Sequence, residues 1–170
     1  PVLAKIYRAY ISEVVAIMRN NKCISNIYIE GDGVWAVYNT SSMGDVNSVF
    51  ATAFCISSLI DALNIKLEKK NYQSINIGIG IDDSESLYIK AGHNGSGINE
   101  VVWLGKTVGR AAELSSFGNK SYLDREIMIS EKVYTCLSDH NKNLMSWNHN
   151  RNCYHGNVIS PYMDEWRQKN

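Results

Sequence analysis

Apolar residues along this 170-residue chain recur with two different periods. Over residues 2–19 and again over 44–69 they return every three or four positions, which is the spacing of a helix with one apolar face. Between these segments, residues 25–39 are rich in β-formers around a Gly-Asp-Gly sequence at 31–33, which predicts a hairpin with Asp-Gly as its turn. The pattern therefore predicts a helix, a hairpin and a longer helix, in that order.

The rest of the chain predicts shorter elements. We expect strands at 74–81 and 86–91, a helix at 106–117 that ends near Gly118, a strand at 126–130, a helix at 131–137, and further strands around 145–147 and 153–158. This order predicts an α+β sheet with helices packed on one face. Neither a repeat nor a proline-rich linker interrupts it, so residues 1–170 are predicted to form a single domain.

Composition and charge exclude several classes of partner. The chain has 17 basic and 17 acidic residues and a formal net charge of +0, so there is no overall field to attract nucleic acid or an anionic membrane. A small polyanion would need a local binding site. Cys23, Cys55, Cys136 and Cys153 lie far apart and favour neither a zinc site nor disulfides. With no signal peptide and no apolar run of membrane-spanning length, we predict a cytoplasmic protein.

Three motifs in a fixed order carry a family resemblance. The Gly-Asp hairpin at 31–33 is followed by INIGIGI at 75–81 and WLGKTVGRAAEL at 103–114. Together they resemble the class III nucleotidyl cyclases over residues 2–130, and within them the pyrimidine cyclases of bacterial anti-phage (Pycsar) systems. The resemblance implies a ferredoxin-like βαββαβ cyclase sheet with extra C-terminal strands.

One strand of that sheet is missing from this chain. Cyclase domains similar to this one begin with a strand that carries a first metal-binding aspartate. Here the chain opens at Pro1, at the entrance of the following helix, and no aspartate precedes Asp32. Loss of a central strand would expose apolar surface and unpaired backbone, so we expect an N-terminally incomplete cyclase domain.

The resemblance assigns catalytic roles to two residues. A cyclase joins the ribose 3′-hydroxyl of a nucleoside triphosphate to its own α-phosphorus, with two Mg²⁺ or Mn²⁺ ions. Asp32 corresponds to the second metal-binding carboxylate, although an Asp-Gly turn alone would also explain it. The family's asparagine and transition-state arginine fall at Gly109 and Glu113. We predict that Arg110 supplies the missing charge; the alternative is an exposed arginine paired with Glu113.

Two positions implied to recognise the base also depart from the purine cyclases. Four residues before Asp32, where purine cyclases have lysine or glutamate, stands Tyr28; three residues before Gly105, where adenylate enzymes have aspartate or threonine, stands Val102. An aromatic residue at the first position suits a smaller pyrimidine. Cross-strand packing would also explain Tyr28, and Val102 would serve as an ordinary strand residue. Trp103 is interpreted as a packing residue, and the glycine-rich loop at 92–97 as a flap or a long turn.

These features predict a pyrimidine nucleotide cyclase that converts UTP or CTP to cUMP or cCMP and pyrophosphate. The resemblance implies a head-to-tail homodimer in which Asp32 comes from one chain and Arg110 from the other, and a separate effector protein that responds to the product. A purine cyclase and a degenerate nucleotide-sensing module remain as alternatives. The Asp32 hairpin and Tyr28 favour the enzyme, whereas the lost asparagine and arginine positions favour the module.

Overall fold

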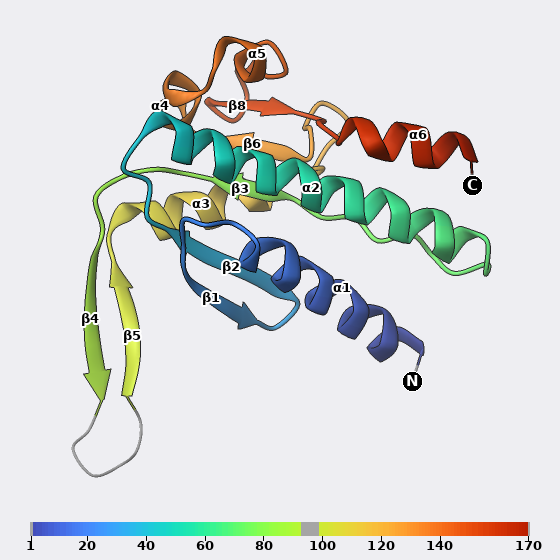
Figure 1. The fold of residues 1–170 in the computed structure, drawn as a ribbon, viewed down its shortest axis with the longest axis horizontal. Coiled ribbons are helices and arrows are strands. Elements are labelled where there is room, and N and C mark those ends of the chain that lie inside the picture. Colours follow the sequence, from blue (N-terminus) through green and yellow to red (C-terminus); the bar gives the residue numbers. More distant parts are fainter. Residues whose placement is uncertain (1, 93–98, 170) are drawn as a thin grey trace.

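The N-terminal part of the fold follows the apolar pattern closely. The computed structural model describes residues 2–92 and 99–169. Helix α1 (Val2–Arg19) leads into the hairpin of β1 (Ile24–Glu30) and β2 (Gly33–Tyr38), and α2 (Met43–Glu68) follows as the longest helix (Figure 1). These boundaries are nearly those predicted, because each element has its own short-range period.

The C-terminal part contains short elements. They are β3 (Ile79–Ile81), β4 (Leu87–Gly92), β5 (Asn99–Leu104), α3 (Lys106–Phe117), β6 (Ile127–Ile129), α4 (Glu131–Cys136), α5 (Asp139–Lys142), β7 (Ser146–Asn148), β8 (Cys153–Gly156) and α6 (Pro161–Lys169). The strand predicted at 74–81 was too long, since only its last three residues pair with a neighbour. The predicted loop at 92–97 lies almost wholly outside the described residues.

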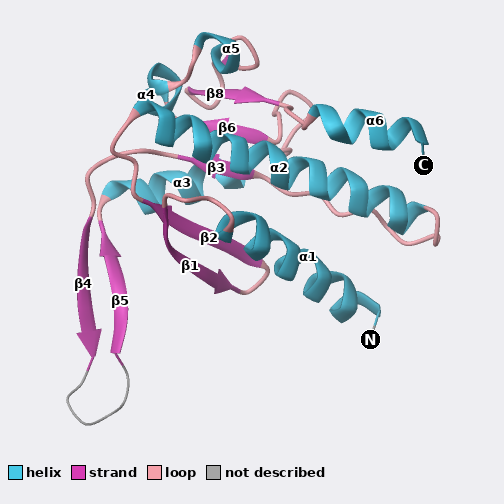
Figure 2. Cartoon of the chain, viewed as in Figure 1, coloured by secondary structure: helices cyan, strands magenta, loops and turns pink. Residues whose placement is uncertain are grey.

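The strands form three separate sheets within the described residues (Figure 2). The central sheet has the order β3-β6-β8-β7, with β3 parallel to β6 and the other pairs antiparallel. The hairpins β1–β2 and β4–β5 stand apart from it, with no strand pairing to the central sheet. Strands β7 and β8 are the extra C-terminal strands that the sequence predicts.

Helices cover both faces of the central sheet, so the prediction of helices on one face was wrong. Ile127 and Ile129 of β6 belong to a core cluster with Phe50 of α2. Met128, which lies between them, packs on the other side with Leu114 of α3. All three residues of β6 are fully buried, and alternate side chains of a strand point to opposite faces, so each face needs its own helix.

Helix α2 corrects a second expectation. Among the described helices it is the one that is long and apolar enough, by length and composition alone, to cross a membrane. In the structure its apolar side packs on the sheet through Val46, Phe50 and Ala53, as in the core helix of a globular domain. Ser42 and Asp45 begin the helix with a reciprocal capping box.

Helix α3 lies directly against the backbone of β3. A methyl group at Gly80 would overlap the backbone of Ala111 and Ser115, and one at Gly78 would overlap the Ser115 carbonyl. The glycines of the INIGIGI motif therefore allow helix and strand backbones to touch, which no larger residue permits.

The β4–β5 hairpin extends away from the rest of the molecule (Figure 1). Apolar side chains along it are exposed: Leu87, Tyr88, Ile89, Val102 and Leu104. Single exposed apolar residues are common on protein surfaces, but a run of them on one projecting hairpin is typical of a contact surface.

Replacement of Gly80 by alanine should destabilise the domain. The added methyl group has no space beside α3, and overpacking of this kind costs about 1–3 kcal/mol. Gly109→Ala, on the exposed side of α3 with no atom near the new methyl group, should instead stabilise the domain by about 0.5–1 kcal/mol. Urea unfolding of both variants measures this, and equal effects would contradict the close contact.

Candidate active site

Asp32 occupies the turn between β1 and β2. Glu30 pairs with Gly33, so the two central residues of the turn are Gly31 and Asp32 rather than Asp32 and Gly33 as predicted. Gly31 has a φ of 62°, which a glycine adopts without strain at the first central position of a type II′ turn. The turn holds the Asp32 carboxylate at an exposed strand end.

A small cavity of about 90 Å³ lies beside this carboxylate. It is lined by Asp32, by Ile6, Tyr7 and Tyr10 of α1, and by residues 75–77. Burial raises the pKa of the Tyr10 phenol, and the nearby Asp32 charge raises it further. The cavity thus lies between the β1–β2 hairpin and the segment that leads into β3.

Asp32 is one candidate ligand for the two-carboxylate metal site that the resemblance implies. Asp32 offers one oxygen-rich ligand of the kind that Mg²⁺ and Mn²⁺ prefer. Over residues 2–92 and 99–169, no group of three or more His, Cys, Asp or Glu side chains is arranged to hold a metal ion. Asp32 therefore fits the role of one metal ligand, and a second carboxylate is needed to complete the pair.

Tyr28 lies in the middle of β1 between two tryptophans. Its ring stacks on Trp35, its partner across the hairpin, with ring centroids 4.1 Å apart. Its hydroxyl oxygen accepts a hydrogen bond of 2.9 Å from Nε1 of Trp103 on β5. The packing interpretation of Trp103 was incomplete, because this residue ties the projecting β4–β5 hairpin to β1. Since 75 residues separate the two partners, no local pattern could indicate the bond.

Val102, the second residue predicted to recognise the base, lies on the β4–β5 hairpin. Val102 pairs with Ile89 across the β4–β5 hairpin, and its side chain is 37% exposed. Side chains alternate along a strand, so Val102 and Trp103 point to opposite faces of β5. The described contacts therefore bring Trp103, rather than Val102, to Tyr28.

Arg110 lies on α3 and makes two polar contacts. Its Nη1 forms an ion pair of 2.7 Å with Oε2 of Glu113, as the alternative prediction had it, and its Nη2 donates to the backbone carbonyl of Asn152 at 3.2 Å. The side chains are 30% and 52% exposed, so this ion pair contributes little to stability. Within one chain, no described contact joins Arg110 to Asp32.

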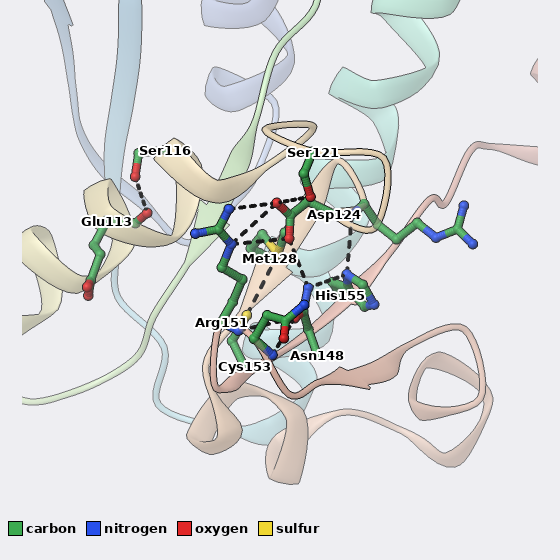
Figure 3. Close-up of polar contacts among 11 residues, drawn as sticks. Glu113, Ser116, Ser121, Asp124, Met128, Asn148, Arg151, Cys153 and His155 are labelled. Atoms are coloured by element: carbon green, nitrogen blue, oxygen red, sulfur yellow. Dashed lines mark hydrogen bonds and ion pairs between the residues drawn. The ribbon is translucent and has the colours of Figure 1, made fainter.

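Asn152 belongs to the β7–β8 turn, which a buried polar network holds in place (Figure 3). Arg151 donates from both Nε and Nη2 to the carboxylate of Asp124, with its shortest contact at 2.9 Å. Asn148 donates from Nδ2 to Asp124 Oδ1 at 3.1 Å, and its side-chain Oδ1 accepts from the backbone N–H groups of residues 150 and 151. The turn is thereby fixed to the loop before β6.

The network shifts the protonation of its members. The hydrogen bonds from Arg151 lower the pKa of the Asp124 carboxyl to about 2, although its burial opposes this change. Burial lowers the pKa of the His155 imidazole, and the nearby Arg125 charge lowers it further. Asp124 is therefore charged and His155 is stabilised in its neutral form, in which Nδ1 can accept from the backbone N–H of Arg125.

The same turn contacts α3 at two points. The Arg151 guanidinium lies over the ring of Phe117 at 4.6 Å, and the Asn152 carbonyl accepts from Arg110. The sequence analysis missed this network, since Asp124 and Arg151 are 27 residues apart. The remaining signal was weak: an arginine in a polar turn between two short strands.

A solved structure with the same fold defines the class of domain. The crystal structure of the guanylyl cyclase Cya2 matches with a TM-score of 0.65 at 15% sequence identity, covering 85% of this chain and 69% of that one. This likeness confirms the α+β, ferredoxin-like cyclase fold that the sequence predicted.

Curated sequences then place the chain within the class. A uridylate cyclase of Treponema porcinum is 38% identical over 144 residues, which cover 85% of this chain and 50% of that protein. A uridylate cyclase of Gulbenkiania mobilis is 32% identical over an alignment of 185 positions, which covers 99% of this chain and 72% of that protein. The chain belongs to the class III nucleotidyl cyclases of the pyrimidine type. It spans about half the length of the Treponema relative. None of the models of known protein families matches it.

Replacement of Asp124 by asparagine should lower stability in a pH-dependent way. A carboxylate with a folded-state pKa of about 2, below its ordinary value near 4, stabilises the fold above pH about 4 and loses this effect as the pH falls toward 2. The urea midpoint of Asp124→Asn should therefore lie below that of the wild type at pH 7, and the gap should close between pH 4 and 2. Ser121→Ala, which removes a weaker donor to the same carboxylate, should give a smaller gap over the same interval. A gap that stays constant with pH would contradict the assignment.

Proposed function

We propose that this protein is a pyrimidine nucleotide cyclase, a lyase that converts UTP or CTP to the 3′,5′-cyclic monophosphate and pyrophosphate. The observation that supports this most directly is Tyr28, an aromatic residue where purine cyclases carry lysine or glutamate. Two further observations support it: the chain belongs to the nucleotidyl cyclases, and two of its relatives are named uridylate cyclase.

Asp32 would hold one side of the metal site. Two Mg²⁺ or Mn²⁺ ions, when bound, lower the pKa of the ribose 3′-hydroxyl and neutralise charge on the triphosphate. The two-residue turn fixes the backbone of Asp32 at the end of the hairpin, from which its carboxylate would reach a metal ion. A second carboxylate would complete the metal site.

Arg110 would stabilise the charge that develops on the α-phosphate. Its ion pair with Glu113 is half-exposed, so a triphosphate could replace Glu113 as the partner at small cost. The bond to the Asn152 carbonyl keeps the guanidinium close to the β7–β8 turn while this exchange takes place. Arg110 would thus be positioned before substrate arrives.

The working unit would be a head-to-tail homodimer with two equivalent sites. One chain would supply Asp32, and its partner would supply Tyr28, Val102 and Arg110. The exposed apolar side chains of the β4–β5 hairpin provide a surface suited to a second copy. In the cell, we propose a cytoplasmic enzyme whose product acts as a second messenger on a separate effector protein in anti-phage defence.

The first test asks which nucleotide the enzyme converts. Full-length protein is incubated with each of the four ribonucleoside triphosphates and Mn²⁺, and the products are identified by mass. UTP or CTP should be cyclised, and exclusive conversion of ATP or GTP would support the purine alternative. If the wild-type protein binds nucleotide but converts none, the result would support the nucleotide-sensing module.

Asp32→Asn keeps the turn but removes a charge from the metal site, so turnover should fall by orders of magnitude without loss of fold stability.

The second test separates Arg110 from Glu113. Loss of a transition-state donor costs about 3–4 kcal/mol, so Arg110→Ala should lower kcat by about two to three decades with a smaller change in KM. Glu113→Ala should have a much smaller effect, because a carboxylate does not stabilise a triphosphate. Equal and small effects would leave Arg110 as a surface ion-pair residue.

The same variants test the shared site. Asp32→Asn and Arg110→Ala proteins, each inactive alone, are mixed and allowed to exchange subunits. A mixed dimer carries both substitutions in one site and neither in the other, so activity should recover to about a quarter of the wild-type level. Native mass spectrometry should show that the mixture contains mixed dimers. If it does and activity still does not recover, both residues would belong to a site formed by one chain.

A further inference from the structure

The orientation of Tyr28 is fixed from two directions. Its ring is held by the stack on Trp35, where the ring planes differ by 18°. Its hydroxyl is held by Nε1 of Trp103 at 2.9 Å. Trp103 is itself positioned by Tyr88, its partner across β4–β5, with ring centroids 5.3 Å apart. Both the ring and the oxygen of Tyr28 therefore have defined places.

The bond to Trp103 has only one possible polarity. An indole N–H donates a hydrogen bond and has no acceptor, so the Tyr28 oxygen must accept. A phenol carries a single proton, and with its oxygen already engaged as an acceptor, its next strong hydrogen bond is the one in which the O–H donates. Trp103 therefore leaves the Tyr28 O–H as the hydrogen-bond donor to a further group that contacts this hydroxyl.

Uracil and cytosine differ in this respect. At position 4, uracil carries a carbonyl oxygen, which accepts, whereas cytosine carries an amino group, which donates. A phenol O–H directed at the uracil oxygen makes a hydrogen bond. The same O–H directed at the cytosine amine would bring two donors together and leave both unpaired. Sites that leave buried polar groups unpaired discriminate strongly between similar substrates.

We propose that Trp103 determines base specificity by holding Tyr28 as a hydrogen-bond donor to O4 of uracil, so that the site selects UTP over CTP. The proposal rests on the pyrimidine cyclase function above and names its substrate. Tyr28 is the residue that touches the base, and Trp103 is a positioning residue that acts through it.

The test compares kcat/KM for UTP and CTP in full-length wild-type, Trp103→Phe and Tyr28→Phe proteins. The wild type should prefer UTP by about ten- to a hundredfold. Trp103→Phe keeps an aromatic ring against Tyr88 but removes the N–H. The Tyr28 oxygen is then free to accept from the cytosine amine, and the preference should fall by about tenfold, chiefly because CTP becomes a better substrate.

A double-mutant cycle distinguishes this role from packing. Tyr28→Phe should also remove the preference, and adding Trp103→Phe to it should change the preference no further, because no hydroxyl remains to be oriented. Trp35→Phe is the matched control, since it alters the stack and leaves the Trp103 N–H in place; it should change UTP and CTP turnover by the same factor. If Trp103→Phe lowers both activities equally, or if the two effects add, the proposal is overturned.

Two measurements without turnover separate this proposal from the proposed function. The first is the dissociation constants of α,β-methylene UTP and α,β-methylene CTP. The second is the nitrogen-15 spectrum of the indole groups, in which the Trp103 resonance should move when Tyr28 is replaced by phenylalanine. If no nucleotide is cyclised but the UTP analogue binds about tenfold more tightly, and loses this advantage in Trp103→Phe, the cyclase function fails and the selectivity proposal holds. If the analogues bind equally, or the resonance does not move, the selectivity proposal fails whatever the reaction.

Discussion

The direct contact between the backbones of α3 and β3 is the constraint on which the rest of the domain depends. Gly78 and Gly80 place no side chain between the strand and the helix. The spacing of the two backbones therefore does not depend on any side-chain rotamer. This contact brings Leu114 onto Met128 and thereby closes the second face of the central sheet. Because α3 follows β5 directly, the same contact also determines where Arg110 and the base of the projecting hairpin lie.

A second restraint acts on α3 through the β7–β8 turn. Asp124 is buried and charged, so Arg151 must remain beside it, and the same arginine lies over Phe117 at the end of α3. The neighbouring Asn152 carbonyl accepts from Arg110. The helix is thus held against the sheet by close packing and against the turn by charge. The Arg110–Glu113 pair is one of the exposed polar contacts of this helix, and under the proposed function it is the contact that a phosphate would replace.

What the sequence could predict follows from the range of each interaction. The hairpin and the helices at 2–19 and 44–69 have local periods, and their boundaries were nearly correct. The Tyr28–Trp103 and Asp124–Arg151 bonds join distant residues, and no local period records them. Helices on both faces were predictable in principle, because Ile127, Met128 and Ile129 are consecutive apolar residues. A strand covered on one face only would alternate apolar and polar residues. Residues 74–78 alternate like a strand but pair with no described neighbour, so pattern alone overestimated β3.

The chemistry-bearing residues of one chain lie in two groups. Asp32 is next to Tyr10 and the cavity under α1, whereas Tyr28 contacts Trp103 on β5, and β5 passes through Gly105 into the helix that carries Arg110. Under the proposed function, the base would be recognised by Tyr28 of β1 together with Trp103 of the continuous β5–α3 unit, which also carries Arg110. The metal ligand would belong to the turn at the end of β1. If a two-fold axis places the turn of one copy against the β5–α3 unit of the other, each site receives both groups. The exposed apolar hairpin, which begins at the same unit, gives that arrangement a surface through which two copies can associate.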